Sequence, residues 1–308
     1  MIETDEYIQL DFEALERGYK SCRGAVKKFF ASHIWTIKNL PGDQRQAMDA
    51  VLFNLMRTID LLDLESGNGL PLDVYHETRD CLSDAFQDKC SSVELAALVD
   101  TSVKYDIPKQ FLFDPLRGAD YWIRNREFNT YDELEAFCSH VGGSSMAAAT
   151  PILGVVKEGW EVLATQCGKA IMLNQILASS GEALKRNKIF FAKEDMEDCG
   201  VDIAKLKLKK DTKPFRFLVR LYATRIEKLF YDCAEFANHL DFDGNRSLKS
   251  LLGMHWKMLL KMKVEPECIL SEEGVLSRRD QLTLKSRALL GMEKELPIIA
   301  PSHDDHHH

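Results

Sequence analysis

Residues 47–64 read AMDAVLFNLMRTIDLLDL, and this stretch decides the fold class. Its apolar residues recur three and four positions apart, as on one face of an α-helix, with Asn54 off that stripe. Pro41 and Gly42 mark the start of the helix, and the turn-rich run GNGLP at 67–71 marks its end. The spacing predicts a long, largely buried helix whose apolar stripe contains Leu52, Leu55, Met56, Ile59 and Leu62.

The same helical spacing recurs in nearly every long segment of the 308 residues. Helical runs of about 15 to 25 residues lie between short turn signals, and no alternating strand pattern exceeds a few residues. With 45% hydrophobic residues, 17 Gly and 9 Pro, the composition suits a helical core better than a β-rich fold. We predict one all-α domain over residues 1–292 and a loosely ordered C-terminal tail at 293–308.

Charge and composition exclude several classes of protein. The net charge is −8, and no basic stripe with interleaved aromatic residues is recognised, so nucleic acid is not an expected partner. The eight cysteines form no C-x-x-C pair and read as reduced thiols. The acidic first residues lack the pattern of a signal peptide, and no apolar run reaches about 18 residues, so we expect a cytoplasmic protein.

Arg57, Asp60 and Asp63 form the first charged group inside an apolar helix. Residues three apart share a helix face, so the two carboxylates could hold a hard divalent cation while Arg57 binds an anion. The alternative is an ion pair between Arg57 and Asp60 at an exposed helix end. Spacing alone leaves both interpretations open.

Two further polar groups are candidates for binding. Lys185, Arg186 and Lys188 could bind an anion such as a diphosphate, although basic residues are also common at the C-terminal end of a helix. His33, next to Ser32, is a candidate for proton transfer, although a lone histidine is more often a structural residue.

The order of several segments resembles the bacterial dehydrosqualene, squalene and phytoene synthases. The resemblance is collinear and nearly gap-free, and it covers most of the chain. Its segments are YKSCRGAVKKFFASHIWTIKNLPGDQRQAMDAVLFNLMRTIDLLD, YDIPKQFLFDPLRGADYW, NTYDELEAFCSHVGG, TPILG, CGKAIMLNQIL, KRNKIFFAKEDMEDCGVDIAKL and VLSRRDQLTLKSRALL. The agreement of all these segments in order is more specific than any single one.

This resemblance implies an isoprenoid-synthase-type helical fold around a deep apolar cavity, with two aspartate-rich motifs facing each other across its mouth. Members of the family bind prenyl diphosphates through magnesium, ionise one of them and couple the allylic cation to a second prenyl group. Metal and cationic side chains must neutralise the leaving diphosphate, and a dry cavity must protect the carbocation.

The first motif is displaced in this chain. Asp60 matches the first family aspartate, Leu64 fills the place of the second, and Asp63 lies one residue early on the same helix face. Glu65 could assist only if the helix ended there. Arg57 matches a family arginine that helps to hold the diphosphate.

The second motif is largely lost. The family run begins at Gln175, and Ser179 and Ala183 occupy its two aspartate places, so Glu182 is the carboxylate that remains. Serine is a weak magnesium ligand and alanine is none. Lys188 replaces a family arginine, and Ser32 matches a family serine near the diphosphate.

Three hypotheses follow. The first is a divergent prenyltransferase that ionises a prenyl diphosphate at a reduced Mg²⁺ site formed by Asp60, Asp63 and Glu182. Its catalytic residues would be Arg57, Asp60 and Asp63, and its substrate-binding residues would be Ser32, Arg57, Gln175, Lys185, Arg186 and Lys188. The second is an inactive relative that binds an isoprenoid or a partner protein. The third is a helical scaffold without affinity for prenyl diphosphates.

The resemblance also implies the partners that are expected under the first hypothesis. They are a prenyl diphosphate such as farnesyl or geranylgeranyl diphosphate, a membrane surface that receives the apolar product, and a partner enzyme.

Overall fold

The computed structural model describes residues 11–64, 70–207, 213–271 and 274–289. These residues form helices joined by short loops, and their only extended pairing consists of two isolated β-bridges. The prediction of an all-α fold is therefore confirmed. The helices are α1 (Phe12–Phe29), η1 (Ile34–Asn39), α2 (Gly42–Asp63), α3 (Leu70–Ala85), α4 (Val93–Lys104), α5 (Lys109–Asn125), α6 (Tyr131–Cys138), η2 (Ser139–Gly143), α7 (Ser144–Ala149), α8 (Trp160–Lys185), α9 (Lys193–Asp198), α10 (Ile203–Lys207), α11 (Lys213–Ala237), α12 (Phe242–Val264), η3 (Pro266–Leu270) and α13 (Arg278–Leu289).

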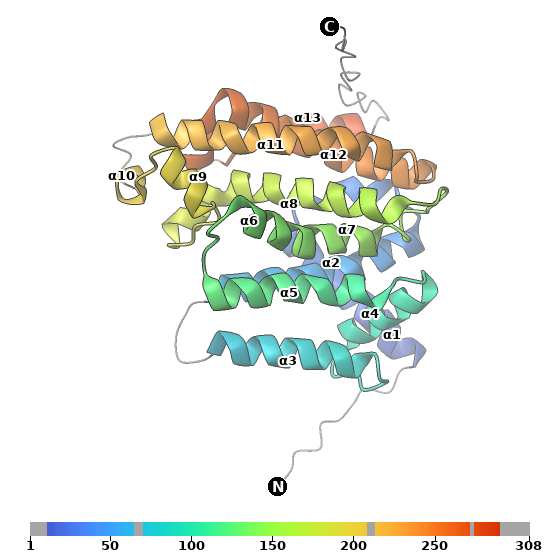
Figure 1. Cartoon of the computed structure of the whole chain (residues 1–308). Coiled ribbons are helices and arrows are strands. Elements are labelled where there is room, and N and C mark those ends of the chain that lie inside the picture. The colour runs from blue at the N-terminus through green and yellow to red at the C-terminus, as the bar shows by residue number, and fades with distance from the viewer. Residues whose placement is uncertain (1–10, 65–69, 208–212, 272–273, 290–308) are drawn as a thin grey trace, which may run out of the picture.

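The long helices lie in layers across the molecule, as Figure 1 shows. α11, α12 and α13 form one outer layer, α8 lies beneath them, and α5 and α2 follow on the other side of α8. The main buried apolar cluster extends from Trp35 to Leu276 and draws on nearly all of these helices. α8 is therefore the central element, and its C-terminal end lies at the same end of the bundle as that of α2.

The helix predicted from residues 47–64 forms as α2, but its buried face differs from the predicted stripe. Leu62 is buried as predicted, but Leu52, Leu55, Met56 and Ile59 are only half-buried. Asn54, which was placed off the stripe, is 5% exposed. The Asn54 side chain donates a hydrogen bond to the Leu112 carbonyl of α5 at 2.9 Å, which satisfies the buried amide. Because α2 packs against α1, α4 and α5 together, no single stripe describes its burial.

Thr130 and Glu133 have the spacing of a capping box, which predicts the start of a helix, and the structure contains this cap with a small change. The Thr130 hydroxyl accepts a hydrogen bond from the Glu133 backbone N–H at 3.3 Å, and the Glu133 carboxylate reaches back to the N–H of Asn129 at 2.6 Å. The α-helix ends at Cys138, and the chain continues as the π-helical turn η2.

Two predictions fall on residues outside the described ranges, namely the C-terminal tail at 293–308 and the role of Glu65. Within the described ranges, no helix is long and apolar enough to cross a membrane.

Candidate functional site

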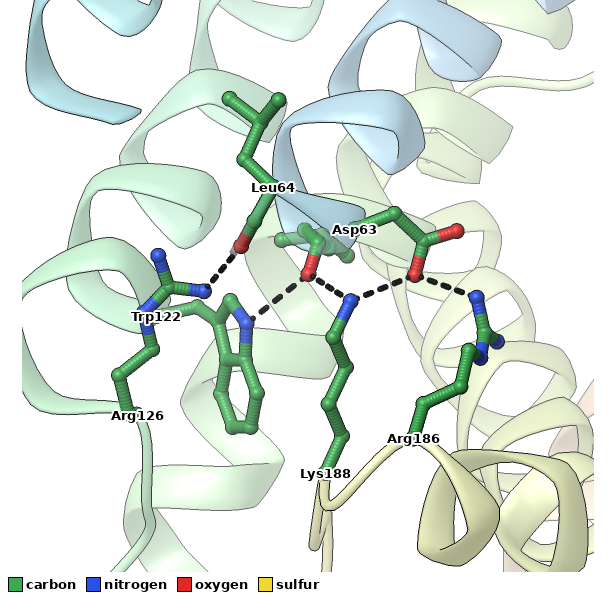
Figure 2. A network of polar contacts seen from close by, with 7 residues as sticks. Asp63, Leu64, Trp122, Arg126, Arg186 and Lys188 are labelled. Carbon is green, nitrogen blue, oxygen red and sulfur yellow. Dashed lines mark hydrogen bonds and ion pairs between the residues drawn. The ribbon is translucent and has the colours of Figure 1, made fainter. Parts of the chain in front are cut away.

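The C-terminal end of α2 is held by side chains from two other parts of the chain. The last carbonyls of a helix have no partner within it. The Leu62 carbonyl accepts hydrogen bonds from Trp122 Nε1 at 3.2 Å and Lys188 Nζ at 3.0 Å, and the Leu64 carbonyl accepts one from Arg126 at 2.9 Å (Figure 2). Two cations thus lie at the negative end of the α2 dipole, where they are stabilising.

Asp63 brings the two predicted motifs together. One carboxylate oxygen, Oδ1, accepts hydrogen bonds from Arg186 at 3.0 Å and Lys188 at 2.9 Å (Figure 2). Partial burial would raise the pKa of Asp63, but the hydrogen bonds and charges of Lys188 and Arg186 outweigh it and hold that pKa below its usual value. We name Asp63, Arg186 and Lys188 the end cluster.

Asp60 lies one turn earlier on α2 and is exposed. Partial burial and the neighbouring charge of Asp63 both raise its pKa. Among the described residues it has neither a hydrogen-bond partner nor an ion-pair partner for its side chain. The alternative interpretation of the sequence, an ion pair between Arg57 and Asp60, is therefore not what the structure contains.

Arg57 is directed to a different part of the molecule. Burial lowers its pKa, and the groups that oppose this shift, Cys81, Glu94 and Glu77, lie on α3 and α4. In the described part of the chain, no hydrogen bond or ion pair joins Arg57 to another predicted site residue. The structure therefore brings Arg186 and Lys188 to Asp63 but leaves Arg57 apart from them.

The end of α8 shows what replaces the second motif. The Ser179 hydroxyl donates to the Gln175 carbonyl at 2.8 Å, and Ala183 is 5% exposed. Glu182 forms an exposed ion pair with Lys185 at 2.6 Å. A side chain at Gly181 would meet the Ile269 carbonyl at 2.1 Å, so glycine is needed here for the close approach of η3.

These contacts decide whether the predicted carboxylates can bind Mg²⁺. Magnesium requires a compact, near-octahedral shell of oxygen ligands. Asp63 is paired with two cations, Glu182 is paired with Lys185, and Asp60 stands alone. No group of three or more His, Cys, Asp or Glu side chains among the described residues could hold a metal ion. The carboxylates that the structure describes do not, as arranged, fit a magnesium cluster.

A second polar group lies deeper, between η1, α8 and α12. Asn174 is fully buried, and its Nδ2 donates to the His255 carbonyl at 2.9 Å and lies 3.1 Å from His255 Nδ1. The ring centroids of His33 and His255 are 5.4 Å apart, and Ser32 Oγ lies 2.8 Å from His33 Nδ1. The Gln175 side chain lies against His33. We name His33, Asn174, Gln175 and His255 the inner cluster.

The inner cluster is uncharged at neutral pH. Burial lowers the pKa of His33 to about 4, against a smaller opposing effect of Gln175, and burial and His33 lower that of His255 well below its usual value. Because the Asn174 amide donates toward His255 Nδ1, that nitrogen accepts and Nε2 carries the proton. This N–H and the side-chain oxygens of Asn174 and Gln175 are buried without hydrogen-bond partners within the described residues.

The sequence predicted Ser32 and Gln175 as site residues but missed Asn174 and did not assign His255 a role. The signal available for Asn174 was its polar side chain within the apolar run of α8. The pairing of Asn174 with His255 spans 81 positions, so no local pattern could have revealed it.

Comparisons with known proteins agree with this architecture. A sequence model of the family described as squalene/phytoene synthase matches residues 26–280. A chloroplastic phytoene synthase 2 of Solanum lycopersicum is 25% identical over 229 residues, which is 72% of this chain and 72% of that protein. For the Daucus carota phytoene synthase, also 25% identical, the alignment covers 72% of this chain and 56% of the relative.

A crystal structure of a dehydrosqualene synthase in complex with ligand shares the fold, with a TM-score of 0.78 and 22% identity over 91% of this chain and 98% of that one.

Proposed function

Because the chain belongs to the squalene/phytoene synthase family, whose members are prenyl-transferring enzymes, we propose that it is a divergent prenyltransferase that binds a prenyl diphosphate at the joined ends of α2 and α8. Farnesyl and geranylgeranyl diphosphate are the substrates of the expected class. The observation that carries this proposal is the end cluster, in which Arg186 and Lys188 already converge on one anionic oxygen. A phosphate oxygen of a ligand is the same kind of partner.

The end cluster supplies part of the positive charge that ionisation of a diphosphate requires. The C–O bond of the substrate breaks, both electrons remain on the diphosphate, and Arg186 and Lys188 neutralise the charge that develops there. The allylic carbon then bonds to a double bond of the acceptor prenyl group, which afterwards loses a proton. Asp63 must release the two cations before they can bind the diphosphate. This description includes no metal, since the described carboxylates do not form a cage for one.

A second candidate is an inactive relative that binds an isoprenoid without turnover. It is favoured by the ion pairs of Asp63, which occupy the two cations, and by the loss of ligands at Ser179 and Ala183. Losing metal-bridging carboxylates removes stabilisation that ordinary family chemistry needs.

The deciding experiment is incubation with farnesyl or geranylgeranyl diphosphate, with added Mg²⁺ and with EDTA. Calorimetry measures binding, a coupled assay measures diphosphate release, and mass spectrometry identifies products. The first proposal expects release together with a coupled prenyl product. Binding without release supports the inactive relative, and absence of both contradicts the two together.

A matched pair of variants tests the site. Lys188→Ala removes a member of the end cluster, whereas Lys193→Ala removes an exposed lysine paired with Glu127 on the same side of the molecule. We expect diphosphate binding to weaken at least about tenfold in the first variant only. Equal losses in both variants would contradict the assignment of the end cluster.

A further inference from the structure

Arg126, at the end of α5, is a half-buried cation without an anionic partner. Its Nη1 donates a hydrogen bond to the Leu64 carbonyl at 2.9 Å, and this is the one hydrogen bond of its side chain within the described ranges. Its Nε is buried without a hydrogen-bond partner among those residues. Burial lowers the pKa of Arg126, but a guanidinium keeps its charge at neutral pH. A buried donor without a partner costs free energy, so this side chain would gain from a further acceptor.

The charged residues that flank Arg126 in the sequence are paired. Arg124 pairs with Asp120 at 2.8 Å, and Glu127 pairs with Lys193 at 2.6 Å. Both pairs are largely exposed, where a lone charge would cost little. Arg126 is more buried than either flanking residue, yet no carboxylate in the described part of the chain lies within ion-pair distance of it. The charge that most needs a partner is therefore the one that has none.

The backbone of Arg126 also departs from the usual pattern. The residue ends α5 in the left-handed conformation, with φ of 58° and ψ of 7°. Glycine is common at such a helix end, because a side chain is strained there. The other non-glycine residues with positive φ in the described ranges have short polar side chains that tolerate this conformation, namely Asp88, Asp106 and Asn187. A long cationic side chain at a glycine position indicates a task beyond ending the helix.

Trp122 places Arg126 beside the end cluster. It lies one turn before Arg126 on α5, and its Nε1 donates to the Leu62 carbonyl, which also accepts from Lys188 Nζ. Its ring stacks on Phe190, two residues beyond Lys188, with the ring centroids 4.2 Å apart. Figure 2 shows Arg126 and Lys188 on either side of the Trp122 ring. This buried side chain ties the end of α5 to the end of α2 and to the segment that carries Lys188.

The shared carbonyl allows Lys188 to turn toward a ligand. When Lys188 leaves, the Leu62 carbonyl keeps its hydrogen bond from Trp122 at 3.2 Å and is not left without a partner. The exchange therefore costs less than it would at a carbonyl with a single donor.

The three cations at this site reach different acceptors. Arg186 and Lys188 converge on one oxygen of Asp63, so a single phosphate oxygen could take its place. Arg126 donates to the Leu64 carbonyl instead, and it forms neither a hydrogen bond nor an ion pair with Asp63. An anion that reaches all three cations must be longer than one carboxylate or one phosphate group. A diphosphate, with oxygens on two linked phosphorus atoms, meets this requirement.

We propose that Arg126 determines specificity for a diphosphate over a monophosphate, by binding one phosphate group while Arg186 and Lys188 bind the other. A guanidinium suits this role because it can donate two parallel N–H groups to a phosphate. The inference rests on the proposed function, since it adds a residue to the same site. Neither helical spacing nor the family resemblance pointed to Arg126.

The experiment is calorimetry in EDTA with farnesyl diphosphate and farnesyl monophosphate, which differ by one phosphate group. We expect Arg126→Gly to bind the diphosphate at least about tenfold more weakly, and the monophosphate less than about threefold more weakly. Equal losses for both ligands, or no loss for either, would overturn the proposal. Diphosphate binding that requires Mg²⁺ would assign the second phosphate group to a metal and overturn it as well.

The matched control is Arg124→Gln, which removes one positive charge from the same helix at a residue that is already paired. Both affinities should stay unchanged in this control. A loss of diphosphate affinity equal to that of Arg126→Gly would show an effect of net charge alone and contradict the assignment.

Two further measurements separate binding from a structural role. Glycine suits the left-handed position, so Arg126→Gly should melt at the temperature of the unchanged protein or above it. Arg126→Gln keeps a donor for the Leu64 carbonyl without the charge, and its diphosphate affinity should fall as in Arg126→Gly. Arg126→Lys keeps the charge and should retain more affinity than Arg126→Gln. Full affinity in Arg126→Gln would mean that the side chain only caps α2, which would refute its role in specificity.

The proposed function fails in a different way. If the unchanged protein binds farnesyl diphosphate selectively but releases no diphosphate and forms no product, the transferase activity is refuted while the role of Arg126 stands. If turnover occurs and Arg126→Gly keeps the full preference for the diphosphate, the role of Arg126 alone is refuted. No affinity of the unchanged protein for either ligand would contradict both.

Discussion

The end cluster adjoins the C-terminal end of α8, and the inner cluster includes Asn174 and Gln175 of the same helix, yet the two clusters handle charge in opposite ways. The end cluster keeps three ionised side chains at an exposed helix end, where each charge has an opposite partner. The inner cluster holds two imidazoles that burial keeps neutral. Exposure allows charge with modest pairing, whereas burial removes charge unless it is fully paired.

This difference accounts for the changes in the second motif. A carboxylate that bridges metal ions is stable only where metal or cations compensate it. Ala183 is buried and Gly181 is pressed against η3, so both positions of α8 are closed by packing. The cations that follow α8 instead meet Asp63 across the gap between two helix ends.

The largest effect is expected when a charged side chain is placed at a buried position of α8. Ala183→Asp restores an aspartate at a family position, but an uncompensated carboxylate there should lower the free energy of unfolding by about 3 kcal/mol or more. Urea denaturation at pH 7 measures this change in the free energy of unfolding. Ser179→Asp is the control because Ser179 is half-buried, and its loss should be clearly smaller. Unchanged stability of Ala183→Asp, with or without Mg²⁺, would contradict a closed α8.

Sequence patterns predicted more of the fold than of the candidate site. Helical spacing predicted α2, and the Thr130 cap predicted the start of α6, because such signals are local. Asn54 was misplaced because its partner, Leu112, comes from another helix.

The site depended on contacts that periodicity does not encode. Asp63 and Lys188 are 125 positions apart, and their pairing with each other rather than with a metal follows from where two helices end. The successive spacings of three suggest one helix surface for Arg57, Asp60 and Asp63, but the offsets add up to about 120° between Arg57 and Asp63. That rotation about α2 is enough to send Arg57 toward α3 and α4.

Removing the Lys188 side chain tests the end cluster, whose residues are charged. Its side chain is 12% exposed and donates to both Asp63 and the Leu62 carbonyl, so Lys188→Ala should cost about 2 kcal/mol of unfolding free energy. Arg186→Ala removes a 55% exposed partner and should cost about 0.5 kcal/mol. Denaturation curves of the two variants give the comparison, and equal costs would show that burial does not separate the two cations.

The pH dependence of stability tests the inner cluster, whose imidazoles are neutral. The pKa of His33 is about 4 in the folded protein and near 6.5 in the unfolded chain, so between these values the unfolded chain binds more protons. Stability should therefore fall as pH drops from about 6.5 toward 4. Between pH 7 and pH 5 the fall should be smaller by about 1 to 2 kcal/mol in His33→Gln than in the unchanged protein. Parallel pH profiles would show that His33 is not held neutral by burial.

The smallest change in stability, and the sharpest test of the end cluster, comes from Asp63→Asn. Asp63 is 48% exposed and solvent screens its ion pairs, so the free energy of unfolding should change by less than about 1 kcal/mol at pH 7. The depressed pKa of Asp63 means that its contribution is present at neutral pH and is lost only as pH falls through that pKa. Because Asp63 competes with a ligand for Arg186 and Lys188, the variant should bind farnesyl diphosphate several-fold more tightly in EDTA, as calorimetry can show. Asp60→Asn, which removes an unpaired carboxylate from the same helix, should leave that affinity unchanged. Weaker binding of Asp63→Asn, confined to solutions containing Mg²⁺, would instead make Asp63 a metal ligand and reverse its assignment as a competitor.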